Sequence, residues 1–160
     1  MAEELISASE YGYIVYVRAL LEAGADVAQA TAHGSTALMH ASENGHLECV
    51  RALLEAGADV AQATAQGSTA LIYASQKGRL GCARALLEAG ANVAQADEDG
   101  CTALMCASHE GQLECARALL EAGADVMQLH GDGHAARSSS LLSCASLASC
   151  SARTHPRARR

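Results

Sequence analysis

Apolar residues recur along this chain with a short period and a long one. Within residues 47–54 they are spaced three or four positions apart, which is the pattern of one face of an α-helix. The string RALLEAGA continues this face and occurs four times, 33 residues apart, at residues 18–25, 51–58, 84–91 and 117–124. A unit this short cannot bury its own apolar face, so its copies must stack on one another. The pattern therefore predicts an all-α repeat solenoid of stacked helix-turn-helix units with short loops.

Glycines and capping residues divide each unit into two helices. In residues 31–63, Thr36 stands before a short first helix and Gly45 follows it. A second helix is expected from Leu47 to Ala56, and Gly57 comes directly after it. A threonine hydroxyl can accept a hydrogen bond from the free N–H groups of a first turn, and glycine readily takes the left-handed conformation that ends a helix. The expected order in each unit is therefore loop, helix, turn, helix.

Four segments connect this plan to a known family: GSTAL at 34–38, GHLE at 45–48, LLEAGADV at 53–60 and DEDGCT at 97–102. They resemble the ankyrin repeat, whose pattern contains D-x-x-G-x-T-P-L-H-x-A-A, G-H-L-E and L-L-x-x-G-A-D-V-N. The resemblance covers about four-fifths of the chain. It implies an ankyrin-repeat domain over residues 1–130, with a partial repeat at 1–30, full repeats at 31–63, 64–96 and 97–129, and a tail at 131–160 that starts a degenerate fourth repeat.

The first helices depart from the family pattern at two positions. The family's Pro is replaced by Ala37, Ala70 and Ala103, and its His by Met39, Ile72 and Met105. The hydrogen bonds that such a His makes to the turn in ankyrin proteins are therefore missing. Since each net hydrogen bond contributes about 1 kcal/mol, we expect a stability below that of a consensus array.

The units differ from one another mainly at the loop tips and at the ends of the first helices. Ankyrin proteins commonly engage partners through the concave face that these parts form, so the resemblance implies a binding surface there. The candidate contact residues are Tyr11, His33, Glu43, Asn44, Gln66, Gln76, Lys77, Glu98, Asp99, His109 and Glu110.

Tyr11 is the most specific of these candidates. Exposed tyrosine is a common interface anchor, and the chain has no Phe or Trp to take that role. The alternative is that Tyr11 shields the first helix pair at the end of the solenoid. For Tyr73, semi-buried packing between helices is favoured over partner contact.

Charge is unevenly divided along the chain. Residues 1–130 carry 17 acidic and 6 basic side chains, net −11, whereas residues 131–160 carry one Asp and five Arg, net +4. An acidic body disfavours nucleic-acid binding, which requires clustered Lys and Arg. Glu98, Asp99 and Glu110 are expected to gather around His109 and to attract a protein partner with a basic segment. A solvated acidic face explains the same charges.

Other chemistry has little support in the sequence. There is no Gly-rich phosphate loop, no G-x-S-x-G and no H-E-x-x-H, so we expect no enzyme, cofactor or small-molecule substrate. No apolar run is long enough to cross a bilayer, and the acidic start lacks a basic targeting segment, which favours the cytoplasm or nucleus. Cys49, Cys82 and Cys115 share one repeated position on the apolar helix face, where reduced and inert thiols are expected.

The tail supports two interpretations. Its Ser- and Arg-rich composition favours disorder, whereas Leu141, Cys144, Ala145 and Ala148 lie at helical spacing and could cap the last repeat. Candidate zinc ligands are also present at His130, His134, Cys144, Cys150 and His155. Only one close pair exists among them, so no metal site is expected.

The sequence as a whole predicts a non-catalytic module that binds a protein segment on its concave loop and first-helix face. Two alternatives stay open. One is a structural or fragmentary repeat array with no specific partner, and the other is the recognition module of a larger multidomain protein.

Overall fold

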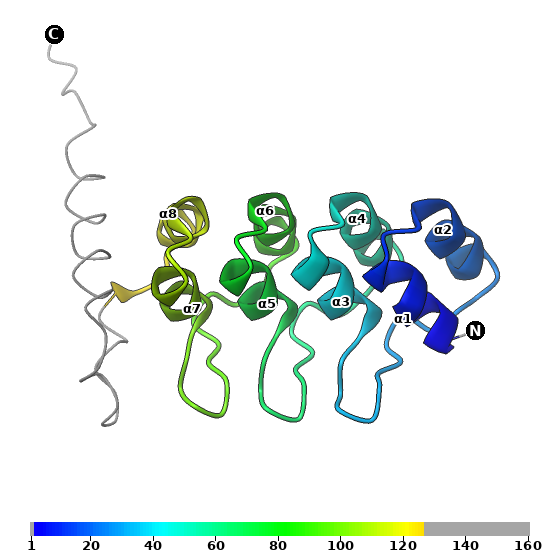
Figure 1. The fold of residues 1–160 in the computed structure, drawn as a ribbon, viewed down its shortest axis with the longest axis horizontal. Helices are drawn as coiled ribbons and strands as arrows, with labels where there is room; N and C mark the ends of the chain where they lie inside the picture. Colours follow the sequence, from blue (N-terminus) through cyan, green and yellow to red (C-terminus); the bar gives the residue numbers. More distant parts are fainter. Residues whose placement is uncertain (1, 127–160) are drawn as a thin grey trace, which may run out of the picture.

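Helices arranged in pairs build the whole of the described structure (Figure 1). The structure is a computed structural model, and it describes residues 2–126. Its helices are α1 (Ala2–Glu10), α2 (Ile14–Glu22), α3 (Ala37–Asn44), α4 (Leu47–Glu55), α5 (Ala70–Gln76), α6 (Leu80–Glu88), α7 (Ala103–His109) and α8 (Leu113–Glu121). The predicted all-α repeat solenoid is confirmed.

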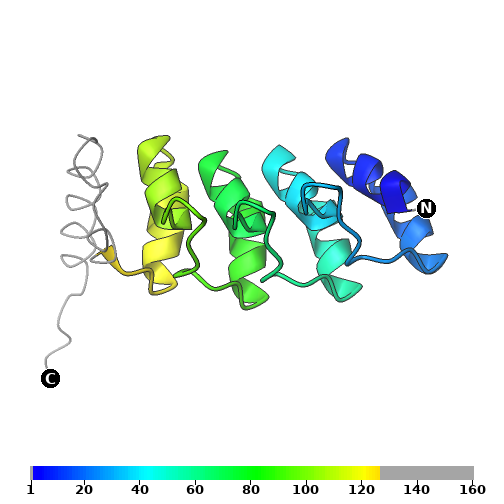
Figure 2. The same cartoon turned by 90° about the horizontal axis from the view of Figure 1, so that it is seen from below.

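The helix pairs stack side by side into an elongated array of two layers. The first helices α1, α3, α5 and α7 pack on one another in sequence, and so do the second helices α2, α4, α6 and α8. The loops before α3, α5 and α7 extend from the first-helix layer, on the side away from the second helices (Figures 1 and 2). Among the described helices, the most extensive contacts between pairs are therefore those between neighbours, as expected for a solenoid.

The helix ends form as the sequence predicts. The Thr36 hydroxyl accepts a hydrogen bond from the Met39 N–H at 3.4 Å, and Thr69 and Thr102 cap α5 and α7 in the same way. Gly45 and Gly57 have φ of 83° and 86°, the left-handed conformation that ends α3 and α4. The predicted caps and stops are therefore confirmed.

One of the positions that lack the family's histidine has gained another contact. The backbone N–H of Thr102 donates to the thioether sulfur of Met105 at 3.4 Å. The methionine thereby supplies an acceptor for the N-terminal end of α7, although sulfur is a weaker acceptor than oxygen or nitrogen.

The core is a continuous row of side chains between the two layers. The first leucine of each pair is buried, at Leu20, Leu53, Leu86 and Leu119. The second leucine is only half-buried and packs against the edge of the core, at Leu21, Leu54, Leu87 and Leu120. The first leucine of each pair therefore lies within the core and the second at its edge, because two adjacent residues on a helix point in directions about 100° apart.

Several predictions concern residues outside the described part of the chain. These are the disordered or capping tail, with Leu141, Cys144, Ala145 and Ala148, and the zinc candidates His130, His134, Cys150 and His155.

Candidate binding surface

The loop tips are held at fixed positions by backbone hydrogen bonds between consecutive units. The Ala65 N–H donates to the carbonyl oxygen of His33 at 3.0 Å, and the Glu98 N–H donates to that of Gln66, also at 3.0 Å. An isolated β-bridge closes the base of each loop, joining Ala30 to Thr36, Ala63 to Thr69 and Ala96 to Thr102. The tip side chains are thus displayed in register along the array.

The tip candidates from the sequence are solvent-exposed. His33, Gln66 and Asp99 occupy corresponding tip positions, and all three are exposed, as is Glu98. In the last loop the Asp97 carboxylate accepts hydrogen bonds from the backbone N–H groups of Asp99 and Cys101, at 3.0 and 2.8 Å. This turn fixes the backbone of the tip while leaving the Glu98 and Asp99 carboxylates at the surface.

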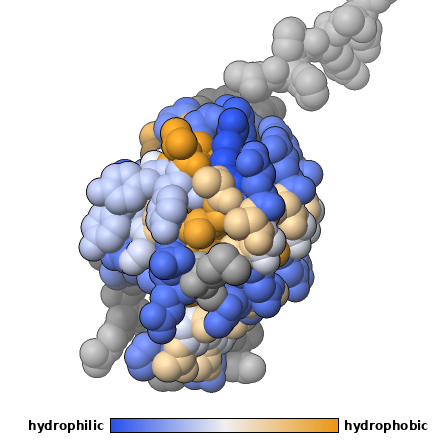
Figure 3. All heavy atoms as spheres, turned by 90° about the vertical axis from the view of Figure 1, so that its right-hand side faces the viewer, coloured by the Kyte–Doolittle hydropathy of each residue, from blue (hydrophilic) through white to orange (hydrophobic). Residues whose placement is uncertain are grey.

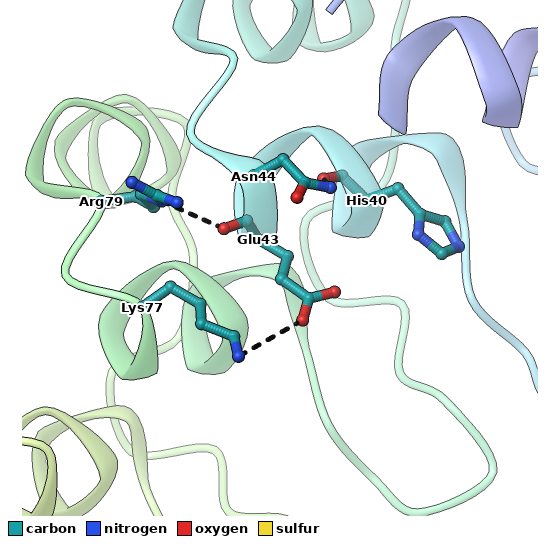
Figure 4. A network of polar contacts seen from close by, with 5 residues as sticks. All are labelled: His40, Glu43, Asn44, Lys77 and Arg79. Atoms are coloured by element: carbon teal, nitrogen blue, oxygen red, sulfur yellow. Dashed lines mark hydrogen bonds and ion pairs between the residues drawn. The ribbon is translucent and has the colours of Figure 1, made fainter. Parts of the chain in front are cut away.

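A second group of candidates lies at the ends of the first helices (Figure 4). The Glu43 carboxylate at the end of α3 lies 3.7 Å from the Lys77 ammonium, which follows α5. Asn44 donates to the carbonyl oxygen of His40 one turn earlier, at 3.0 Å. The Lys77 and Glu43 side chains are 48% and 36% exposed, so we assign the ion pair little stabilising value. Its side chains remain available to a ligand.

The acidic cluster expected around His109 is smaller than predicted. Glu110 Oε1 lies 3.1 Å from His109 Nδ1. Among the contacts of the described residues, neither Glu98 nor Asp99 pairs with His109. The reason is topological: these two acids sit at the tip of the loop before α7, whereas His109 lies at the far end of that helix.

Sequence reasoning missed the residues that join one repeat to the next. His46 Nε2 lies 3.0 Å from the carbonyl oxygen of Glu10, and Arg79 Nε donates to that of Glu43 at 3.1 Å (Figure 4). Each side chain stands directly before the second helix of its own repeat. It reaches back to the end of the first helix of the previous repeat. His46 and Arg79 occupy the same position in successive repeats, and the change from one residue to the other looks like ordinary variation at the surface. The sequence therefore did not indicate that this position joins the repeats.

The cysteines are not poised for chemistry. All five in the described residues are free, and Cys49, Cys82 and Cys115 are 1% exposed. Burial raises the pKa of Cys82 to about 11 and that of Cys106 to about 11. Since the thiolate is the nucleophile, these thiols are unreactive at neutral pH. The expected burial of the thiols in the repeated column is confirmed.

The repeated helix pairs and loops match a known family of repeat proteins. A family model described as ankyrin repeats (3 copies) matches residues 4–64 and 60–129. The chain belongs to the ankyrin-repeat family. Ankyrin repeats are in general protein–protein interaction modules and are typically non-catalytic. No curated protein matches the chain.

Two further observations concern metal-binding groups and membrane-spanning helices. Within residues 2–126, no group of three or more His, Cys, Asp or Glu side chains is arranged to hold a metal ion. None of the helices in that range has the length and apolar content needed to cross a bilayer.

The first ankyrin repeat displays aromatic side chains that sequence reasoning only partly recognised. Tyr11 is exposed in the turn between α1 and α2, and its ring centroid lies 6.0 Å from that of Tyr13. Tyr16 and Val15 are exposed on α2. Tyr73, by contrast, is half-buried against the core, as expected. The sequence held a signal for these residues, because Tyr16 stands at the position that is occupied by cysteine in the other repeats.

Proposed function

We propose that this ankyrin-repeat array is a non-catalytic module that binds a protein segment along the loop tips and the ends of its first helices, the concave face in ankyrin proteins. The observation that supports this most directly is the backbone link between successive loops, through Ala65 to His33 and Glu98 to Gln66. Because the tips are fixed before binding, a partner would not bear the entropic cost of ordering them. Variable side chains on such a constant framework are well suited to specific recognition.

The surface charge favours a partner with a basic segment. The exposed acids Glu98, Asp99 and Glu110 lie on the last repeat, and the repeat domain as a whole carries a net charge of −11 over residues 1–130. Complementary charge raises the association rate and suppresses acidic competitors. Nucleic acid, membrane and small-molecule partners are not part of the proposal. The buried free thiols support a location in the cytoplasm or nucleus.

Peptides of opposite charge test the basic-segment proposal. Binding of a fluorescent Lys- and Arg-rich peptide, and of the same peptide with Glu in place of its basic residues, would be measured by anisotropy at two salt concentrations. We expect only the basic peptide to bind, and more weakly at higher salt. Changing Glu98, Asp99 and Glu110 together to Lys should abolish this binding.

A matched variant controls for overall charge. Glu55, Glu88 and Glu121 are exposed at the ends of the second helices α4, α6 and α8. Changing these three to Lys alters the net charge by the same amount away from the proposed face. Equal loss of binding in both triple variants would show a general charge effect and contradict a defined site.

A display selection with the full chain tests the broader proposal without assuming a basic partner. Alanine substitutions at Tyr11, His109 and Glu110 should weaken the selected ligands. If every selected ligand bound these variants as well as the original chain, a structural array with no specific partner on this face would be the better description.

A further inference from the structure

One end of the array exposes aromatic and apolar side chains. Tyr13, Val15 and Tyr16 of the first helix pair are 62%, 81% and 48% exposed, and the neighbouring Tyr11 is 63% exposed. We call these four residues the α2 end patch. Figure 3 looks onto this end, where a few hydrophobic residues lie among hydrophilic and weakly polar ones. An open, apolar depression lies here, lined by Gly12, Tyr13, Ile14, Val15, Tyr16 and Ala19.

The same helix face is covered in the other repeats. Cys49, Cys82 and Cys115 occupy the position of Tyr16 and are 1% exposed, because the preceding helix pair packs over them. On α2, no described residue covers this face to a similar extent, and Tyr16 is about half exposed. Side chains that expose this much apolar and aromatic surface in one place mark an interaction site.

The patch is not shaped for another repeat stacked in the internal register. Glu4 of α1 is exposed, whereas the corresponding positions Ala37, Ala70 and Ala103 are 1% exposed beneath their neighbours. A repeat stacked in that register would bury the Glu4 carboxylate, which is costly. It would also have to accommodate the Tyr16 ring where a cysteine sulfur normally packs. The α1 half of the end is therefore polar and the α2 half apolar, so the occupant should contact α2 alone.

We propose that the α2 end patch pairs with the same patch of a second copy of this chain. The four side chains expose on the order of 500 Å² per copy, given the area that aromatic side chains bury. Two copies would then bury about 1,000 Å², the lower limit for specific protein interfaces. A two-fold axis running along α2 would place the two α1 helices on opposite sides, so the Glu3 and Glu4 carboxylates of the two copies would not face each other.

This dimer has a characteristic salt dependence. Each copy carries a net charge of −7, so the copies repel one another while the contact itself is apolar. Salt screens the repulsion and leaves the apolar contact intact. Association should therefore tighten as salt rises, whereas binding of a basic peptide to the loop tips should weaken. The two surfaces are thus distinguishable in one series of buffers.

Sedimentation velocity of the full chain under reducing conditions tests the proposal. We expect a reversible monomer–dimer equilibrium in the micromolar range. Val15→Glu should weaken it by at least about tenfold, since each interface would then bury two carboxylates. Val15 is 81% exposed, so the variant should keep its fold, which circular dichroism would verify.

The repeat provides a matched control. Gly81 occupies the position of Val15 in the third helix pair, and the other two pairs carry Glu48 and Glu114 there. Gly81→Glu adds the same charge away from the α2 end patch and should leave the dimer unchanged. Three results would overturn the proposal: a monomer at all concentrations, a dimer that Val15→Glu does not weaken, or assembly beyond the dimer, which would indicate a head-to-tail contact.

Discussion

Arg79 and Glu43 belong to different repeats, yet the Arg79 guanidinium donates from Nε to the Glu43 backbone carbonyl at 3.1 Å. This carbonyl lies in the last turn of α3, where it has no acceptor role within the helix. The arginine therefore satisfies an orphan carbonyl, places a cation at a helix C-terminus and fastens one repeat to the next. His46 reaches Glu10 in the same way one repeat earlier.

Removing this link should weaken the array. We expect Arg79→Ala to lower the free energy of unfolding by about 1 kcal/mol, the net contribution of such a hydrogen bond. Urea denaturation followed by circular dichroism would measure it. Arg84→Ala is the control, because Arg84 is exposed on the same α6 helix. Equal losses in the two variants would show that the contact with Glu43 contributes nothing specific.

Gly45, which ends the helix that contains Glu43, should be sensitive for two reasons. Gly45 has φ +83°, and a Cβ there would lie 2.7 Å from Cδ of Arg79. Gly57 has φ +86° with nothing within 4 Å of such a Cβ. Gly57→Ala should cost about 1–2 kcal/mol for the backbone alone. Gly45→Ala should cost more, because it also displaces Arg79.

A double-mutant cycle separates these two contributions. In an Arg79→Ala background, the cost of Gly45→Ala should fall to that of Gly57→Ala, since the clash is gone. Urea denaturation of the four proteins gives the coupling energy. If the cost of Gly45→Ala is the same with and without the arginine side chain, the steric contribution is refuted.

Buried serines offer a route to a more stable protein. The hydroxyls of Ser42 and Ser75 are buried without a hydrogen-bond partner, whereas Ser108 Oγ donates to the Leu104 carbonyl oxygen at 2.7 Å. An unsatisfied buried hydroxyl is destabilising, so Ser42→Ala should raise the free energy of unfolding by about 1 kcal/mol. Ser108→Ala should not stabilise. Thermal and urea unfolding would compare them, and a loss of stability in Ser42→Ala would contradict the expectation.

Alkaline pH should destabilise the fold through Cys82. Burial, with smaller effects from neighbouring groups, raises the pKa of this thiol from 9.0 to about 11. Below pH 9 the thiol is protonated in both states, and its contribution to stability is fully present. Between pH 9 and 11 the unfolded thiol ionises first, so the free energy of unfolding falls. Urea denaturation across this range should show a shallower decline for Cys82→Ala; identical slopes would exclude the effect.

Much of the fold could be predicted from the sequence because its information is local and repeated. The 33-residue period, the Thr36 cap and the stop at Gly57 each depend on nearby residues, and the same solution recurs in each unit. For the candidate site, the sequence could predict which positions vary between repeats but not which side chains contact one another. The contacts made by Glu43 with Lys77 and Arg79 depend on how far one repeat is rotated and shifted against the next, which no local pattern specifies.

The sequence by itself determined that this chain is a stack of helix pairs with a buried leucine row, because periodic apolar residues must be covered by identical neighbours. Only the tertiary structure decided which side chains are left uncovered. Tyr16 and Cys49 hold the same place in the repeat, yet one is half exposed and the other buried. The difference arises because burial depends on what stacks above a position, and the α2 end patch lies where the described stack ends.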